Sequence, residues 1–298
     1  MHSSMSSSSS SPSSRPSVSV VIGSNAPPES LEACLAALEA QRGGSEVLVL
    51  EGTASPAGLR ERFPWAQYVE RPGLLVPELW RDGIEAAEGE IVALTIAQMV
   101  PAPDWLAQVR AQLAGYDAVG GAIDPGKGLR LTDWAEYFCR YVRDMRPFAP
   151  RDTVDLPGDN AAYKRALLEM VRERWRDGFW ENVVHRYLAA DGVALHQAPE
   201  VVVFQGRSAG WSAFTAQRAA HGRKYGHQRG VHFSRARNLL GVLASPVVPF
   251  LMTWRVLRQV LRKRRYRLRA LASLPLILSF NVVWAYAEAR GHFDMLRR

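Results

Sequence analysis

The sequence predicts an α/β fold with a mostly parallel central sheet, followed by C-terminal helices that associate with a membrane. Two observations predict it: short β-branched runs alternate with helical patterns in the first half, and the charge is uneven along the chain. Residues 231–298 hold 13 Lys and Arg against 2 Asp and Glu, whereas residues 1–230 hold 24 against 27. This basic tail also contains the longest apolar runs, so it indicates an anionic membrane surface and not nucleic acid as its partner.

The elements of the body follow from local patterns. A β-branched strand over 17–22 ends at Gly23, and a helix begins near Pro28 with leucines on one face. Further strands are expected over 46–50 and 66–69, then a helix over 75–87 and a strand from Ile91. This alternation favours a mostly parallel sheet with helices on both faces. Ligands bind beyond the carboxyl ends of such strands, which brings together three polar turns, 23–25, 51–53 and 96–98.

Three segments divide the chain. The Ser-rich residues 1–17 are expected to be a disordered tail, because they have too little apolar surface to offset the entropy of ordering. They also lack the apolar stretch of a secretory signal, so the body is expected in the cytoplasm. Residues 18–230 form the predicted catalytic domain and 231–298 a basic helical hairpin. The two cysteines, Cys34 and Cys139, provide no disulfide framework and no clustered metal ligands.

Four segments carry a family resemblance in the correct order: 18–38, 46–50, 83–106 and 156–192. The last begins with Leu-Pro-Gly-Asp-Asn-Ala-Ala-Tyr-Lys-Arg. Together they resemble family 2 of the inverting glycosyltransferases, in particular its membrane-associated bacterial members. The resemblance implies a nucleotide-binding sandwich of the glycosyltransferase-A type and a nucleotide-sugar donor. It further implies a lipid-linked or polysaccharide acceptor at the cytoplasmic face of the bacterial inner membrane.

The positions that hold the metal in this family differ here. Family members bind Mg²⁺ or Mn²⁺ through an Asp-x-Asp after the fourth strand, and the aligned triplet is Ile96-Ala97-Gln98. A further family ligand, a His after the last strand, aligns with Gln205. A hard divalent cation needs hard, charged oxygen ligands, so we expect no metal cofactor. For Gln98, we favour the role of a polar residue at a strand end over that of a metal ligand.

The other site residues come from the same resemblance. In this family a Gly follows the catalytic carboxylate at a fixed spacing, and counting back from Gly192 gives Glu181 as the base. The Glu181 carboxylate can instead serve only to stabilise the N-terminus of its helix. A shift of one residue would put Asn182 there. The implied acceptor-side residues are Asp159 and Asn160. The expected donor-binding residues are Ser24, Asn25, Glu51, Arg81, Gln98, Gln205, Arg218 and Arg223. Among these, Arg81, Arg218 and Arg223, with Arg207, His221 and Lys224, are the cations available to a departing diphosphate.

The tail contains two uncharged runs, 239–254 and 270–287. Each is near the lower limit for crossing roughly 30 Å of hydrocarbon. Arginines lie between the runs and at both outer ends, which conflicts with the positive-inside bias of a spanning hairpin. We therefore expect shallow or re-entrant helices on the cytoplasmic face, with an ordinary buried helical hairpin as the alternative.

Three functions remain open at this stage. The first is a membrane-associated, metal-independent glycosyltransferase that inverts the sugar's configuration. The second is a catalytically inactive relative that serves as a scaffold or partner subunit in envelope polysaccharide synthesis. The third is a lipid-surface protein that binds no nucleotide. Donor binding separates the third from the others, and turnover separates the first two.

Overall fold

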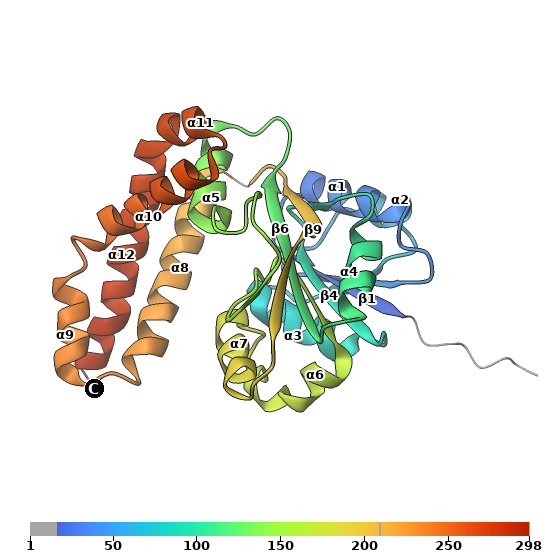
Figure 1. Cartoon of the computed structure of the whole chain (residues 1–298), viewed down its shortest axis with the longest axis horizontal. Coiled ribbons are helices and arrows are strands. Elements are labelled where there is room, and N and C mark those ends of the chain that lie inside the picture. The colour runs from blue at the N-terminus through green and yellow to red at the C-terminus, as the bar shows by residue number, and fades with distance from the viewer. Residues whose placement is uncertain (1–16, 209, 298) are drawn as a thin grey trace, which may run out of the picture.

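The computed structural model describes residues 17–208 and 210–297 (Figure 1). A nine-stranded sheet with helices on its faces forms the body, and a layer of C-terminal helices stands to one side of it. The disordered tail predicted over 1–17 lies outside the described residues, apart from Ser17.

The first half of the body matches the predicted alternation. Its strands are β1 (Val18–Ser24), β2 (Glu46–Glu51), β3 (Gln67–Glu70) and β4 (Ile91–Ile96), all parallel, and its helices are α1 (Pro28–Glu39), α2 (Ala57–Arg62) and α3 (Val76–Ala86). Ser24 pairs with Glu51, and Gly23 pairs with Ile96. The three predicted turns therefore lie side by side at one edge of the sheet.

The whole sheet is mixed, so the expectation of a mostly parallel sheet is wrong. The order is β3-β2-β1-β4-β8-β6-β9-β5, with β7 also paired to β9. The later strands are β5 (Met99–Pro101), β6 (Ala118–Pro125), β7 (Arg151–Thr153), β8 (Asn160–Lys164) and β9 (Leu195–Gln205). Strand β8 runs antiparallel to both β4 and β6, while β5 and β7 run antiparallel to β9. A strand that runs parallel to its neighbour requires a crossover connection. Strand β8 follows a long connection, and no local sequence pattern indicates in which direction it then enters the sheet.

The remaining helices of the body border the sheet and its edge. They are α4 (Trp105–Leu113), α5 (Leu131–Tyr141), α6 (Arg165–Met170), the short 3₁₀ helix η1 (Arg172–Arg174) and α7 (Glu181–Ala190). Helix α5 lies between the sheet and the C-terminal layer (Figure 1).

The C-terminal layer begins at Trp211, within the segment predicted as the catalytic domain. Its helices are α8 (Trp211–Gly230), α9 (Arg235–Leu243), α10 (Val248–Lys263), α11 (Arg267–Ala272) and α12 (Leu274–Leu296). Glycines allow α8 and α12 to pack closely. A Cβ on Gly226 would lie 2.2 Å from the Glu288 carbonyl oxygen, and one on Gly291 would lie 2.4 Å from that of Arg223. A larger residue at either position would push these two helices apart.

The two apolar runs have different surroundings. The run over 270–287 enters α12, where Ile277 and Phe280 are buried. The run over 239–254 is divided between α9 and α10 and leaves several large apolar side chains exposed. Within 17–208 and 210–297, no single helix combines the length and apolarity needed to cross a bilayer. Only α9 and α10 taken together reach both, and they are bent by 72°.

Candidate active site

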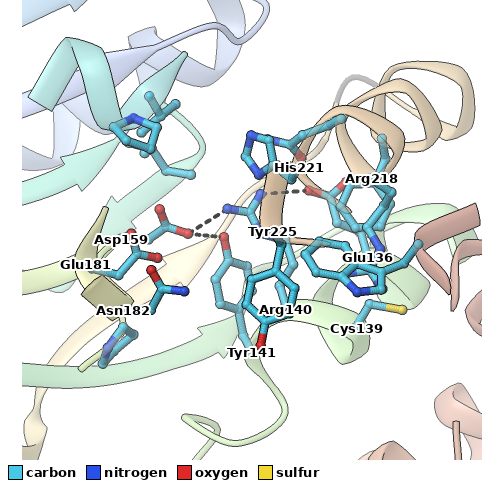
Figure 2. Close-up of a pocket in the computed structure, with 18 of the residues that line it drawn as sticks. Glu136, Cys139, Arg140, Tyr141, Asp159, Glu181, Asn182, Arg218, His221 and Tyr225 are labelled. Atoms are coloured by element: carbon cyan, nitrogen blue, oxygen red, sulfur yellow. Dashed lines mark hydrogen bonds and ion pairs between the residues drawn. The ribbon is translucent and has the colours of Figure 1, made fainter. Parts of the chain in front are cut away.

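A cleft of about 890 Å³ lies between the carboxyl edge of the sheet and the C-terminal helices. Residues from α3, α5, α7, α8, α10 and α12 line it, together with the turn after β4. Figure 2 shows Asp159 and Glu181 on one side of this cleft and Arg218, His221 and Glu136 on the other, with the Arg140 guanidinium between them.

The carboxylate wall carries Asp159 and Glu181. The Asp159 carbonyl oxygen accepts a 3.0 Å hydrogen bond from the Thr95 hydroxyl, which ties the segment before β8 to the end of β4. Next to it, Gly158 leaves room for its neighbours. A Cβ there would lie 3.0 Å from the Trp80 ring and 3.2 Å from the Glu181 carboxyl carbon. The glycine therefore lets the Glu181 carboxyl approach the segment that carries Asp159.

Glu181 is the first residue of α7 and is half-buried in the cleft. Burial, followed by the nearby carboxylate of Asp159, raises the pKa of Glu181 from 4.5 to about 7. A carboxyl group with a pKa near the pH of the cell can accept a proton efficiently.

Arg140, on α5, links the two walls. Its guanidinium donates to the Asp159 carboxylate at 2.8 Å and to Glu136 at 3.4 Å, while the Tyr141 hydroxyl also bonds to Asp159. Burial raises the pKa of Glu136. Sequence reasoning missed Arg140 and Glu136, because both lie between the segments 83–106 and 156–192 that carry the family resemblance. The only local signal was their i, i+4 spacing.

The opposite wall is formed by α8 and carries Arg218 and His221, whereas Lys224 lies on the same helix outside the cleft lining. The Arg218 side chain is buried, with 8% of the residue exposed, and donates to neutral oxygens of Asn281 at 3.0 Å and Phe280 at 3.5 Å. Within the described part of the chain, it forms no ion pair with a carboxylate. The charges of Glu136 and Glu288 act on the Arg218 guanidinium from beyond ion-pair distance, which leaves its direct contacts available to an anionic ligand.

His221 reports the positive potential of this wall. Burial, followed by the charges of Arg140 and Lys224, lowers the pKa of His221 from 6.5 to about 4. The imidazole is therefore neutral at pH 7. The Lys224 ammonium lies 4.0 Å from the ring centroid of Trp180, the residue before Glu181. The cleft thus has Asp159 and Glu181 on one side and the Arg218 guanidinium on the other.

Two of the residues expected to bind the donor, Asn25 and Gln98, line the cleft. The Asn25 amide donates to the Leu74 carbonyl at 2.9 Å. Gln98 lies beside Gln205, since Gly206 N–H donates to the Gln98 carbonyl at 2.7 Å. The two positions that align with metal ligands in the family resemblance are therefore adjacent in space.

These residues do not fit a divalent cation. Ile96 is apolar, Gln98 is a neutral amide, and the buried Gln205 Oε1 has no hydrogen-bond partner among the residues that the structure describes. Over residues 17–208 and 210–297, no three His, Cys, Asp or Glu side chains are grouped closely enough to hold a metal. Neutral amides do not compensate the charge of Mg²⁺ or Mn²⁺ as carboxylates do.

Two predicted donor residues at the strand ends lie outside the cleft. Ser24 is buried. The Glu51 carboxylate is also buried and is occupied by Arg60 at 2.6 Å and by the Ser55 N–H at 2.9 Å. A carboxylate that is already paired in this way is not free to contact a nucleotide.

Three other predicted residues have structural partners. Arg81 pairs with the neighbouring Asp82, and Arg223 pairs with Asp294 on α12, both away from the cleft lining. Asn160 is fully buried, so the predicted acceptor contact does not fit its position. Its amide accepts from Trp105 at 2.8 Å and donates to the carbonyls of Ala122 and Val201, both at 2.9 Å.

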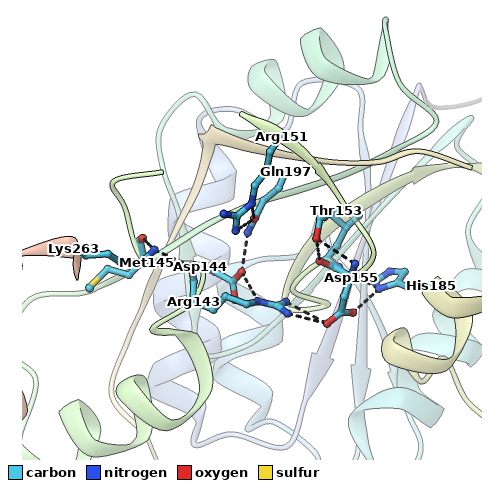
Figure 3. Close-up of polar contacts among 10 residues, drawn as sticks. Arg143, Asp144, Met145, Arg151, Thr153, Asp155, His185, Gln197 and Lys263 are labelled. Atoms are coloured by element: carbon cyan, nitrogen blue, oxygen red, sulfur yellow. Dashed lines mark hydrogen bonds and ion pairs between the residues drawn. The ribbon is translucent and has the colours of Figure 1, made fainter. Parts of the chain in front are cut away.

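A second polar network fixes the far end of the cleft (Figure 3). Arg143 bonds to Asp144 and Asp155, and Asp155 contacts the buried His185 at 2.9 Å. From α10, the Lys263 ammonium donates to the Arg143 carbonyl at 2.8 Å. His185 is therefore a satisfied structural residue, and the network joins the C-terminal layer to the body.

Comparisons with known proteins identify the fold. No protein-family model matches the sequence, and no curated protein sequence matches it either. Among solved structures, the chain is similar to the mannosyltransferase PcManGT from Pyrobaculum calidifontis in complex with GDP-Man and Mn²⁺. The identity is 22%, the TM-score is 0.50, and the match covers 93% of this chain and 74% of that one. The chain therefore has a glycosyltransferase-type fold.

Proposed function

We propose that this protein is an inverting glycosyltransferase that uses a nucleotide-sugar donor without a divalent metal. One observation carries the proposal: Glu181, with a pKa of about 7, faces the buried Arg218 guanidinium across a single cleft in a glycosyltransferase-type fold. Perturbed carboxyl groups in clefts are candidates for proton transfer.

In the proposed reaction, the Glu181 carboxylate takes the proton of an acceptor hydroxyl as its oxygen attacks the anomeric carbon of the sugar. The new glycosidic bond forms while the bond from that carbon to the phosphate oxygen breaks. The electron pair leaves with the nucleoside diphosphate. Attack from the side opposite the leaving group inverts the configuration, and one carboxylate is sufficient for the proton transfer.

Charge stabilisation of the departing diphosphate is assigned to the α8 wall. Arg218 supplies a buried guanidinium that lines the cleft and has no carboxylate within ion-pair distance in the described chain. Fixed cations in a partly desolvated cleft stabilise developing negative charge strongly. The Gln98 and Gln205 amides lie at the donor end and are not required to hold a metal.

Nucleotide-sugar binding tests this proposal. Thermal stability should be measured with GDP-mannose and other nucleotide sugars, each with added Mn²⁺ or with a chelator. We expect one donor to raise the melting temperature equally under both conditions, followed by turnover with a suitable acceptor. A stabilisation that appears only with Mn²⁺ would contradict the metal-free site.

The inactive scaffold remains a second candidate, supported by a specific observation. Glu51 and Asn160 are occupied by internal contacts, and the aligned metal positions are not acidic. Donor binding without transfer to any of a full range of acceptors, and without hydrolysis of the donor, would favour the scaffold role.

The proposed activity is located at the cytoplasmic face of a bacterial inner membrane, on a lipid-linked or polysaccharide acceptor. The basic, apolar composition of residues 231–298 supports this location.

A further inference from the structure

Helix α10 presents different side chains on different faces. Met252, Val256 and Gln259 lie three or four residues apart and line the cleft. Phe250, Trp254 and Leu261 lie on roughly the opposite face. Phe250 and Trp254 are 65% and 56% exposed. One helix therefore separates the cleft from an exposed apolar surface.

Further exposed apolar side chains lie on the neighbouring helices. We define the α9–α11 surface as the exposed apolar residues Leu239, Leu240, Leu243, Val247, Phe250, Leu251, Trp254, Leu261, Leu268 and Leu271. The same segment carries many arginines, and residues 231–287 contain no Asp or Glu. Exposed apolar side chains among cations are typical of segments that lie in the interface of an anionic bilayer.

The cleft opens beside this surface. Arg255 lines the cleft and is also exposed. It lies one helical turn after Leu251, a member of the surface that is 45% exposed. Across the described chain, Arg255 forms no ion pair. It is therefore available to an anionic group that arrives from the bilayer side.

We propose that the α9–α11 surface lies on an anionic bilayer and that the acceptor is a lipid with an anionic head group, which enters the cleft past Arg255. The acceptor part rests on the proposed glycosyltransferase function; the bilayer contact does not. A bilayer fits better than a protein partner because the surface combines scattered apolar residues with a uniform positive charge.

Vesicle flotation tests the bilayer contact. The full chain should float with phosphatidylglycerol vesicles, weakly with phosphatidylcholine vesicles, and less as salt is added. The double variant Phe250→Ser, Trp254→Ser should lose most of this binding. Trp211→Ser is the matched control, since Trp211 is 49% exposed but lies outside the surface. Equal flotation of the double variant and the control would overturn the contact. The contact would also be overturned if neither the wild type nor any variant floated. A protein would then be the better candidate for the partner of the α9–α11 surface.

Cysteine labelling tests where the cleft opens. In a Cys139→Ser background, vesicles should slow the reaction of Arg255→Cys with a water-soluble maleimide at least severalfold. The remaining Cys34 is buried, and burial raises the pKa of its thiol to about 12, so it reacts slowly. Glu61→Cys, on α2 at the far side of the body in Figure 1, should be unaffected. Unchanged labelling at Arg255→Cys would show that the cleft opens to water.

The chemical class of the acceptor requires a separate measurement. With radiolabelled donor and vesicles made from a bacterial lipid extract, the label should become extractable into organic solvent. The Arg255→Ala variant should reduce this transfer about tenfold or more while donor binding is retained. Label found only in water-soluble product would overturn the lipid acceptor but leave the transferase function standing. If no donor binds, the transferase function fails, and flotation and labelling still decide the bilayer contact.

Discussion

Replacing Glu181 by Gln should remove activity and at the same time stabilise the protein above neutral pH. The substitution keeps the size of the side chain and removes only its charge and its ability to accept a proton. If Glu181 is the base, transfer should fall by roughly 10²- to 10⁴-fold, while donor affinity changes little.

The stability change follows from the pKa of Glu181. The folded protein holds the Glu181 proton more tightly than the unfolded chain, because burial and Asp159 raise the pKa from 4.5 to about 7. The folded state is therefore favoured by this group below pH 4.5, and the benefit is lost as the pH rises through about 7. At about 1.4 kcal/mol for each pKa unit, the full effect is about 3 kcal/mol, and partial exposure reduces it to about 1–2 kcal/mol. For a chain of this size, that corresponds to a rise of about 2–6 °C in melting temperature.

The assay is the melting temperature of wild type and Glu181→Gln as a function of pH. The variant should be more stable at a pH of about 8, and the difference should shrink towards a pH of about 5, where both side chains are neutral in the folded state. Asn182→Ala is the matched control on the same helix turn and should show no such pH dependence. A variant that retains wild-type transfer would refute Glu181 as the base. A stability difference independent of pH would refute the raised pKa.

Three further predictions concern the neighbouring residues. Asp159→Asn removes the negative charge that helps to raise the pKa of Glu181, so the acidic limb of the pH profile of transfer should move to lower pH; an unchanged limb would show that burial alone sets the pKa. Arg218→Met should weaken donor binding about 10- to 100-fold, as measured by calorimetry. Arg223→Met makes the same change of charge on the same helix but outside the cleft, and it should not weaken binding. Equal effects of the two variants would argue against a specific diphosphate contact. Asn160→Ala leaves three buried hydrogen-bond partners unsatisfied and should lower the free energy of unfolding by about 3 kcal/mol or more in denaturant titrations. A loss of activity without a loss of stability would instead support its predicted role at the acceptor.

Local patterns in the sequence determined much of the body. The β-branched runs that form β1 and β2 and the leucine face of α1 are visible in the sequence, because periodicity and turn residues report local structure directly. Gly158 and Asp159 were found through the family resemblance, and Glu181 through its spacing from Gly192. The charge asymmetry of residues 231–298 was also visible, since it requires no knowledge of the fold.

Tertiary structure alone decided the direction of β8, the surroundings of the apolar runs and the partners of the polar residues. Arg140 became part of the site only because α5 packs beside the segment before β8, at a sequence distance of 19 residues from Asp159. Conversely, Asn160 and Glu51 matched family positions but are occupied by Trp105 and Arg60. Hydrogen bonds and burial depend on which elements meet in space, and no spacing along the chain reports them. The family segments therefore indicated the region of the site, and tertiary packing decided which of its polar side chains are already bonded within the protein.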